Sequence, residues 1–258
     1  MSAKIMTYET NCKALSLAMV CYAACGALRC AGGLFSNSQP ITIRDAIINP
    51  SRPWEDLILP SSPYPSVISV AGEGSSLTYV TVTLNEFWHS YPLDVGIVVQ
   101  SPAGSNVLLM AWVSNRSFIP PEVWTLTFDD ASDRTPNFQT PLSTGTYRPT
   151  DGRNEDFPFP TNDRSFPFPD VEGYAKPTTW TTTLASFQGE DPNGEWKLFV
   201  TDKRIADFGA IEGGWSLQLT SVPEPQSWVM LSGAALSVFG AVTLHSKLAS
   251  TPRRPPSV

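Results

Sequence analysis

The feature that most constrains the fold is an alternation of apolar and polar residues that recurs throughout residues 40 to 221. Thr78–Leu84 reads TYVTVTL, in which residues of high strand propensity alternate with a period of two, as in a half-buried strand. Similar runs occur at Leu93–Val99, Val107–Val113, Val123–Phe128, Trp180–Leu184, Trp196–Val200 and Trp215–Leu219. Turn residues separate these runs, and only the two ends of the chain suggest helix. We therefore predict an all-β domain over residues 31–221, built as a jelly-roll-like β-sandwich.

Residues 222–258 are organised differently. Pro223-Glu224-Pro225 cannot continue a helix or an inner strand, because proline fixes φ and lacks an N–H. Trp228 opens an uncharged apolar run that ends at Leu244, long enough for a short membrane span. A basic tail over residues 245–258 follows, with Lys247, Arg253 and Arg254. We predict a transmembrane helix over 228–244, with an amphipathic or core helix as the alternative.

This order of motif, span and basic end resembles the PEP-CTERM sorting signal of exported bacterial proteins. The resemblance implies an exosortase-like membrane protease as a partner, which recognises residues 223–225 and removes the tail. In this scheme the two prolines present the peptide and Glu224 determines specificity. Trp228 sets the depth in the membrane, while Lys247 and the two arginines block full translocation.

The N-terminus has the organisation of a signal peptide. Lys4 and Lys13 precede an apolar run from Ala14 to Ala27, which has the length of a signal-peptide core. We predict a signal-peptide helix within residues 1–30 and export by the Sec machinery, with a retained N-terminal anchor as the alternative. The expected location is a membrane-anchored precursor, then the cell surface or the extracellular space. All four cysteines lie in or beside this segment, at Cys12, Cys21, Cys25 and Cys30, so the remaining chain has no disulfides.

Charge narrows the range of partners. The chain has 17 Lys and Arg against 24 Asp and Glu, a formal net charge of −7. Several of the basic residues belong to the terminal segments, so the central domain is more acidic than the whole chain. An acidic surface repels the phosphates of nucleic acids, and we expect no nucleic-acid partner.

Several separated motifs carry a second resemblance. They are VTVTLNEFWHSYPLDVGIVVQSPAG, LTFDDAS, GTYRP, FQGEDPNGEWKLFVTD and GAIEGGWSLQL, in that order. From about Ser66 to Thr220 the chain resembles the P (P/Homo B) domain of subtilisin-like proprotein convertases. It is similar also to bacterial P-domain-like proteins that carry PEP-CTERM tails. The resemblance implies a jelly-roll domain of the kind that stabilises the protease domain of the convertases. It does not extend to the protease domain itself.

The sequence offers little for catalysis. Between the two terminal segments the chain contains one histidine, His89, and no cysteine. Neither a GxSxG nor an HExxH motif is present. We predict that the protein is not an enzyme and that His89, next to a turn in WHSYPLD, has a structural role.

Acidic residues near strand ends suggest a metal instead. Hard oxygen ligands of this kind suit Ca²⁺, and P domains can hold that ion, so we expect structural calcium as the one cofactor to consider. The alternative is that these side chains cap turns through the backbone. The candidate ligands are Asp94, Asp129, Asp130, Asp202 and Asp207.

Two FPFP repeats lie in the long loop over residues 149–177. Their aromatic rings are candidates for binding a polymer or partner, the alternative being that they pack back onto the sandwich. The four residues are Phe157, Phe159, Phe166 and Phe168. Two tryptophans, Trp196 and Trp215, are expected in the core, and two glycines, Gly194 and Gly213, are expected to adopt positive φ in turns.

Taken together, these features predict an exported, non-enzymatic module for adhesion, matrix attachment or binding. Its partner would be exopolysaccharide or a surface protein. The alternatives are a stabilising or regulatory partner of a secreted subtilisin-like serine protease, and a carbohydrate-binding module.

Overall fold

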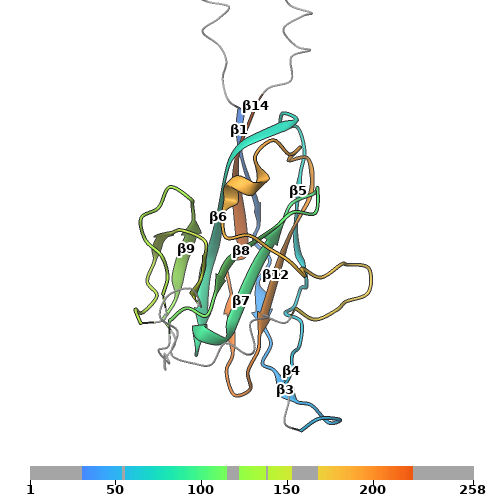
Figure 1. Ribbon diagram of the computed structural model, residues 1–258, viewed down its shortest axis with the longest axis vertical. Helices are drawn as coiled ribbons and strands as arrows, with labels where there is room; N and C mark the ends of the chain where they lie inside the picture. The colour runs from blue at the N-terminus through green and yellow to red at the C-terminus, as the bar shows by residue number, and fades with distance from the viewer. Residues whose placement is uncertain (1–30, 54–55, 115–121, 138, 153–167, 223–258) are drawn as a thin grey trace, which may run out of the picture. The chain divides into compact units, whose positions relative to one another are not determined.

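Two β-sheets packed face to face form the domain (Figure 1). The computed structural model describes residues 31–53, 56–114, 122–137, 139–152 and 168–222. The strands are β1 (Ala31–Asn37), β2 (Ile41–Ile43), β3 (Ile47–Ile48), β4 (Asp56–Leu57), β5 (Ser66–Val70), β6 (Ser76–His89), β7 (Val95–Gln100), β8 (Asn106–Ala111), β9 (Trp124–Phe128), β10 (Gly145–Tyr147), β11 (Thr150–Asp151), β12 (Gly194–Asp202), β13 (Gly209–Ile211) and β14 (Trp215–Val222). Two short 3₁₀ helices accompany them, η1 (Pro92–Asp94) and η3 (Leu184–Phe187).

The long strand β6 organises the first sheet. The strand order is β1-β14-β6-β13-β2, with β9 also on β6 and β10 parallel to β9. The second sheet has the order β11-β8-β7-β12-β5. Strands β3 and β4 form a separate two-stranded hairpin. The prediction of an all-β, sandwich-like domain is confirmed.

The alternation seen in the sequence places one face of each main strand in the core. On β6, Val80, Val82 and Leu84 are buried, and across the ladder Leu217 and Leu219 of β14 are buried as well. Burying apolar side chains of this size contributes roughly 1.5–3 kcal/mol each, so this pair of strands adds substantially to the stability of the core.

The second sheet is covered on both faces. Residues Val95 to Val99 of β7 are all buried, including the glycine between them. On the outer face of the sheet, Val98 belongs to a second apolar cluster. Its other members include Leu93, Leu108, Phe168 and Phe199, with Tyr64 and Trp180 packed against them. The loop after residue 168 therefore acts as an outer layer over this sheet.

Most predicted strands are found, with one error. The run Trp180–Leu184 is not a strand: Thr181 makes a single bridge to Val107, and the chain then enters η3. The cause is a cap, because the Asp130 carboxylate accepts the backbone N–H groups of Leu184 and Ala185 and fixes a helical turn there. Sequence periodicity has no access to that distant carboxylate.

The predictions for turn and core residues have mixed outcomes. Trp196 and Trp215 are essentially fully buried, as predicted. Gly194 has a φ of +130°, also as predicted. The prediction for Gly213 is wrong, because the positive φ, +67°, belongs to Gly214, where a Cβ would strike the backbone of Asn37.

The ends of the described domain lie side by side. Strand β1 runs antiparallel to β14, and Ala31 is the register partner of Ser221 (Figure 1). The described residues contain no helix long and apolar enough to cross a membrane. The expected signal-peptide helix in 1–30 and the expected transmembrane helix over 228–244 both lie outside the described residues.

Candidate functional site

A buried polar cluster lies where β6 and β12 end. Nε2 of His89 on β6 is 3.2 Å from Oδ2 of Asp202 on β12, and both side chains are completely buried. Nδ1 of His89 accepts the backbone N–H of Tyr91 at 3.2 Å, so the ring hydrogen lies on Nε2. The other oxygen of Asp202 accepts the N–H of Arg204 at 2.9 Å. The pair therefore joins the two sheets.

Asp94 is the second buried carboxyl of this cluster. Burial is the main reason that its pKa rises to about 7; Lys203 opposes the rise, and Asp202 and Asp207 add to it. Burial likewise raises the pKa of Asp202, with His89 opposing the rise. Nζ of Lys203 lies over the Trp112 ring, 2.7 Å from its centroid. This region thus holds two carboxyl groups with raised pKa values, and the pKa of Asp94 lies near neutral.

Ser90 links the cluster to the following loop. Its hydroxyl donates to Asp207 at 2.9 Å and accepts the N–H of Phe208 at 3.0 Å. Both interactions of Ser90 lead away from His89, so no serine–histidine pair forms here. A histidine without exposed surface is positioned to hold the fold together, which agrees with the predicted structural role of His89.

The five candidate calcium ligands fall into two groups. Asp94, Asp202 and Asp207 belong to the cluster just described, while Asp129 and Asp130 lie beside η3. Within the described part of the chain, no group of three or more His, Cys, Asp or Glu side chains is arranged to hold a metal ion. Calcium binding stays a prediction.

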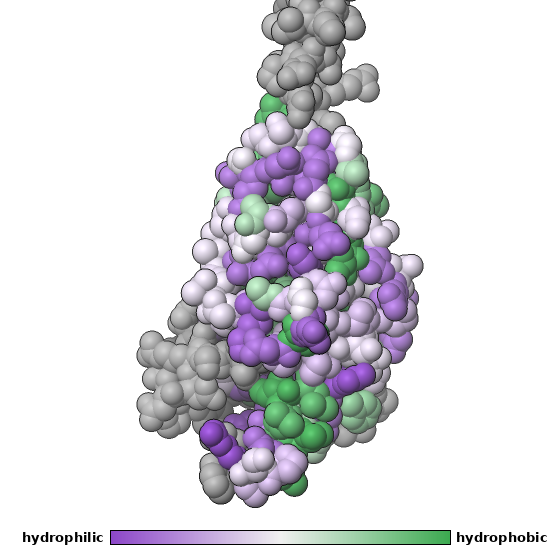
Figure 2. All heavy atoms as spheres, turned by 90° about the vertical axis from the view of Figure 1, so that its right-hand side faces the viewer, coloured by the Kyte–Doolittle hydropathy of each residue, from purple (hydrophilic) through white to green (hydrophobic). Residues whose placement is uncertain are grey.

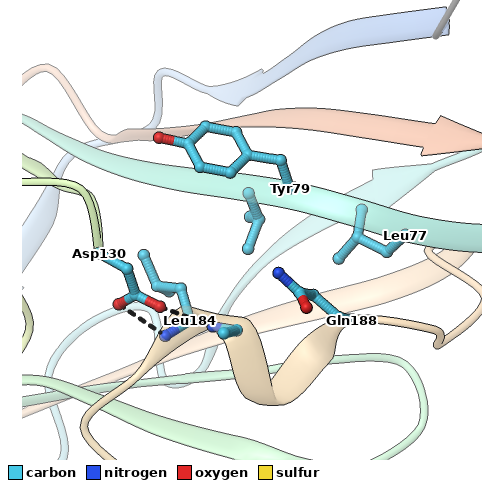
Figure 3. A pocket seen from close by; sticks show the side chains of 7 residues that line it. Leu77, Tyr79, Asp130, Leu184 and Gln188 are labelled. Carbon is cyan, nitrogen blue, oxygen red and sulfur yellow. Dashed lines mark hydrogen bonds between the residues drawn. The ribbon is translucent and has the colours of Figure 1, made fainter.

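A shallow hollow lies between β6 and η3 (Figure 3). Both oxygens of Asp130 are engaged there: they accept the N–H groups of Leu184 and Ala185 and the hydroxyl of Thr183. Tyr79 is 39% exposed, and partial burial with the nearby Asp129 raises its pKa to about 12. The hollow offers an aromatic ring and apolar walls, with its carboxylate already occupied by protein donors.

Exposed apolar side chains gather at the end of the domain where β3 and β4 lie (Figure 2). Ile47 and Leu57 face each other across the hairpin. The β12–β13 loop is attached to the base of this hairpin, because Arg204 O accepts the Ala46 N–H. We call these residues the apolar end: Ile47, Ile48, Leu57, Ile205 and Phe208, which are 43%, 61%, 40%, 41% and 57% exposed.

The remaining predicted site residues are placed as follows. The sorting residues Pro223, Glu224, Pro225, Trp228, Lys247, Arg253 and Arg254 lie outside the described residues, as do Phe157, Phe159 and Phe166. Phe168 is described and is 4% exposed, with its ring 5.7 Å from that of Trp180 in an edge-to-face contact. The Phe168 ring packs onto the sandwich, as the alternative interpretation of the FPFP repeats requires.

Sequence reasoning missed the apolar end and the hollow. Ile47-Ile48 and Leu57 read like parts of ordinary strands, and their exposure depends on the hairpin leaving both sheets. The hollow forms only because Tyr79 of β6 and Asp130, which follows β9, both lie beside η3. One signal was present: isoleucines beside Asn49-Pro50, a turn-forming pair, suggest a tight exposed ribbon.

The family model of the proprotein convertase P-domain matches residues 168–219, from the covering loop through η3, β12 and β13 into β14. The match supports the P-domain resemblance of the central domain, and a P-domain is a non-catalytic accessory domain. Among curated proteins, no match was found.

Proposed function

We propose that this chain is an exported, non-enzymatic β-sandwich module, sorted by an exosortase-type system, that binds exopolysaccharide or a surface protein. Its partners in this scheme are the Sec machinery, an exosortase-like protease and a component of the matrix or cell surface. The mature module then resides at the surface or in the extracellular matrix.

One observation supports the proposal best: the first and last residues of the described domain lie side by side at one end of the sandwich. Ala31, which directly follows the expected signal peptide, is paired with Ser221, two residues before the expected sorting motif. The described residues that adjoin the two terminal segments therefore lie at one end of the sandwich. This arrangement suits a domain that is tethered at that end and displayed at the other.

The apolar end lies at the far side of the domain from this tether. Strand β6 starts beside β14, where Ser76 pairs with Val222, and it finishes where His89 pairs with Gly209. Fourteen residues of extended chain separate these points by about 45 Å. Ile48 and Phe208 are thus presented away from the tether, where a partner has access to them.

Two observations support the absence of enzymatic activity. His89 is buried and paired, so a substrate has no access to it. The matched family is an accessory domain, which stabilises or positions other proteins. Neither observation identifies the binding partner, and the experiments below are designed to identify it.

The test expresses the full chain in its native cells and follows it through membrane, matrix and extracellular fractions. Mass spectrometry of both termini is expected to find a species that ends near residues 223–226 outside the cell. Glu224→Ala is expected to leave the C-terminus intact and the protein in the membrane. A full-length C-terminus in the wild-type extracellular protein would contradict the sorting step.

The binding step has its own variants. Ile48→Ser with Phe208→Ser is expected to release the exported protein from the matrix fraction into the medium. Val123→Ser, equally exposed at 55% but outside the apolar end, is the control and should leave the distribution unchanged. An unchanged distribution in the double variant would rule out the apolar end as the binding surface.

The P-domain match favours a second candidate, a module that stabilises or regulates a separate subtilisin-like serine protease. In that case an active serine protease, labelled by a fluorophosphonate probe, should co-purify with the wild-type protein. Its loss from the Ile48→Ser, Phe208→Ser variant would place it on the same surface. A matrix polymer in its place would favour the first candidate.

A further inference from the structure

Strand β1 leaves one edge of the seven-stranded sheet open. It stands at the end of the strand order, and among the described residues it pairs with β14 alone. The N–H and C=O groups that point away from β14 therefore have no strand partner in that part of the chain. Such an edge is a template on which another strand can add.

The sequence of β1 contains none of the usual obstacles to strand addition. Its seven residues read AGGLFSN, without a charge, a lysine or a proline. Proteins that keep an edge strand unpaired place such residues on it or interrupt it with a bulge. The pairing of β1 with β14 is continuous over all seven residues, from Ala31 to Asn37.

Leu34 occupies the middle of this strand and is its most exposed large side chain. It is 71% exposed, the highest value for a large apolar residue in the described part of the chain. Phe35, the next residue, points the other way and packs against the core. Leu34 thus projects from the outer face of the sheet, between the small neighbours Gly32 and Ser36 on the same face.

We propose that β1 pairs with β1 of a second copy of this chain, antiparallel about a two-fold axis through Leu34. The two Leu34 side chains then lie directly opposite each other, and Gly32 lies opposite Ser36 of the other copy. The pairing is self-complementary, as a closed two-fold dimer requires. It joins the two seven-stranded sheets into one continuous sheet.

The lack of charge on β1 permits a second copy at this edge, even though the chain as a whole is acidic. The chain carries a net charge of −7, so most surfaces of two copies repel each other. Strand β1 brings no charge to the contact, and its single exposed apolar side chain lies on the symmetry axis. An acidic or basic peptide would find no countercharge on this strand. The inference does not depend on the proposed function, although a dimer would make a displayed module bivalent.

Disulfide trapping in the full chain tests the pairing. The four native cysteines are replaced by serine, and Leu34→Cys is introduced into the protein in detergent micelles. Residues directly opposite in an antiparallel pair have Cβ atoms about 4.5–5.5 Å apart, so mild oxidation should produce a covalent dimer. Ile48→Cys, 61% exposed on the hairpin, is the matched control and should stay monomeric under the same oxidation.

Sedimentation provides the second readout. The wild-type chain should be dimeric, Leu34→Lys should be monomeric, and Ile48→Lys should remain dimeric, each with an unchanged circular dichroism spectrum. A wild-type monomer, a dimer that survives Leu34→Lys, or equal cross-linking at positions 34 and 48 would each overturn the proposal. If Leu34→Lys fails to fold, the disulfide experiment decides alone.

Discussion

His89 and Asp202 connect the two sheets through a contact of 3.2 Å between Nε2 and Oδ2, with neither side chain exposed. One residue ends β6 in the first sheet and the other ends β12 in the second. Removing one member of such a pair leaves the other buried without compensation.

We therefore expect His89→Ala to lower the free energy of unfolding by about 3–5 kcal/mol. The control is Arg204→Ala, which breaks the exposed Arg204–Asp56 pair at 3.7 Å and should cost about 1 kcal/mol or less. Urea denaturation followed by tryptophan fluorescence measures both. Equal small effects would show that the buried pair contributes little to stability.

Stability should fall as the pH rises from about 4 to about 8. The pKa of Asp94 is raised to about 7 in the folded protein, so the native state binds a proton that the unfolded state has already lost. The stabilising contribution of protonated Asp94 is complete below pH 4 and disappears as the pH passes 7. Asp94→Asn should reduce this pH dependence, as measured by melting temperature across that range. A steeper dependence in Asp94→Asn would contradict the assignment.

Asp130→Ala should destabilise the turn at η3. The Asp130 carboxylate accepts two backbone N–H groups and the Thr183 hydroxyl, and losing such a cap costs about 1–2 kcal/mol. We expect the same loss with Ca²⁺ and with EDTA, because protein donors already occupy both oxygens. A melting temperature that Ca²⁺ raises in the wild type and not in Asp130→Ala would instead support a calcium site at this position.

Phe168→Ala should cost about 3–5 kcal/mol, because it empties a buried position in the layer over the second sheet. Tyr174→Ala is the control in the same loop; Tyr174 is 40% exposed, and the change should fall within about 0.5 kcal/mol. Chemical denaturation compares the two. A near-neutral Phe168→Ala would mean that the loop contributes little to the second sheet.

The exported protein is expected to begin at or before Ala31. A start beyond this residue removes ladder pairs between β1 and β14, beginning with Ala31–Ser221 and then Gly32–Thr220. Mass spectrometry of the N-terminus of the exported protein checks this. A stable product that starts after residue 33 would show that the domain holds together without half of β1.

The local sequence pattern was sufficient to predict the main strands and the core tryptophans. Within each strand, apolar and polar residues alternate with a period of two, and this alternation is visible without knowledge of the neighbouring strands. Strand β1 was not predicted, since Ala-Gly-Gly has low strand propensity and depends on pairing with the distant β14. The His89–Asp202 contact and the Asp130 cap depend on residues far apart in the sequence, whereas the positive φ of Gly214 belongs to the local turn closed by its N–H on Ile211 O. Such long-range contacts are fixed by the packing of the two sheets.

The position of β14 also determines how the domain responds to force. β14 is hydrogen-bonded on one side to β1 and on the other to β6, along nearly its whole length. A pull on Val222 against a load at the opposite end of the sandwich runs along the axis of this strand, at right angles to its hydrogen bonds. Both ladders are then loaded in shear, with their bonds sharing the load, so the strand that leads to the C-terminal tail is held against mechanical extraction from two sides.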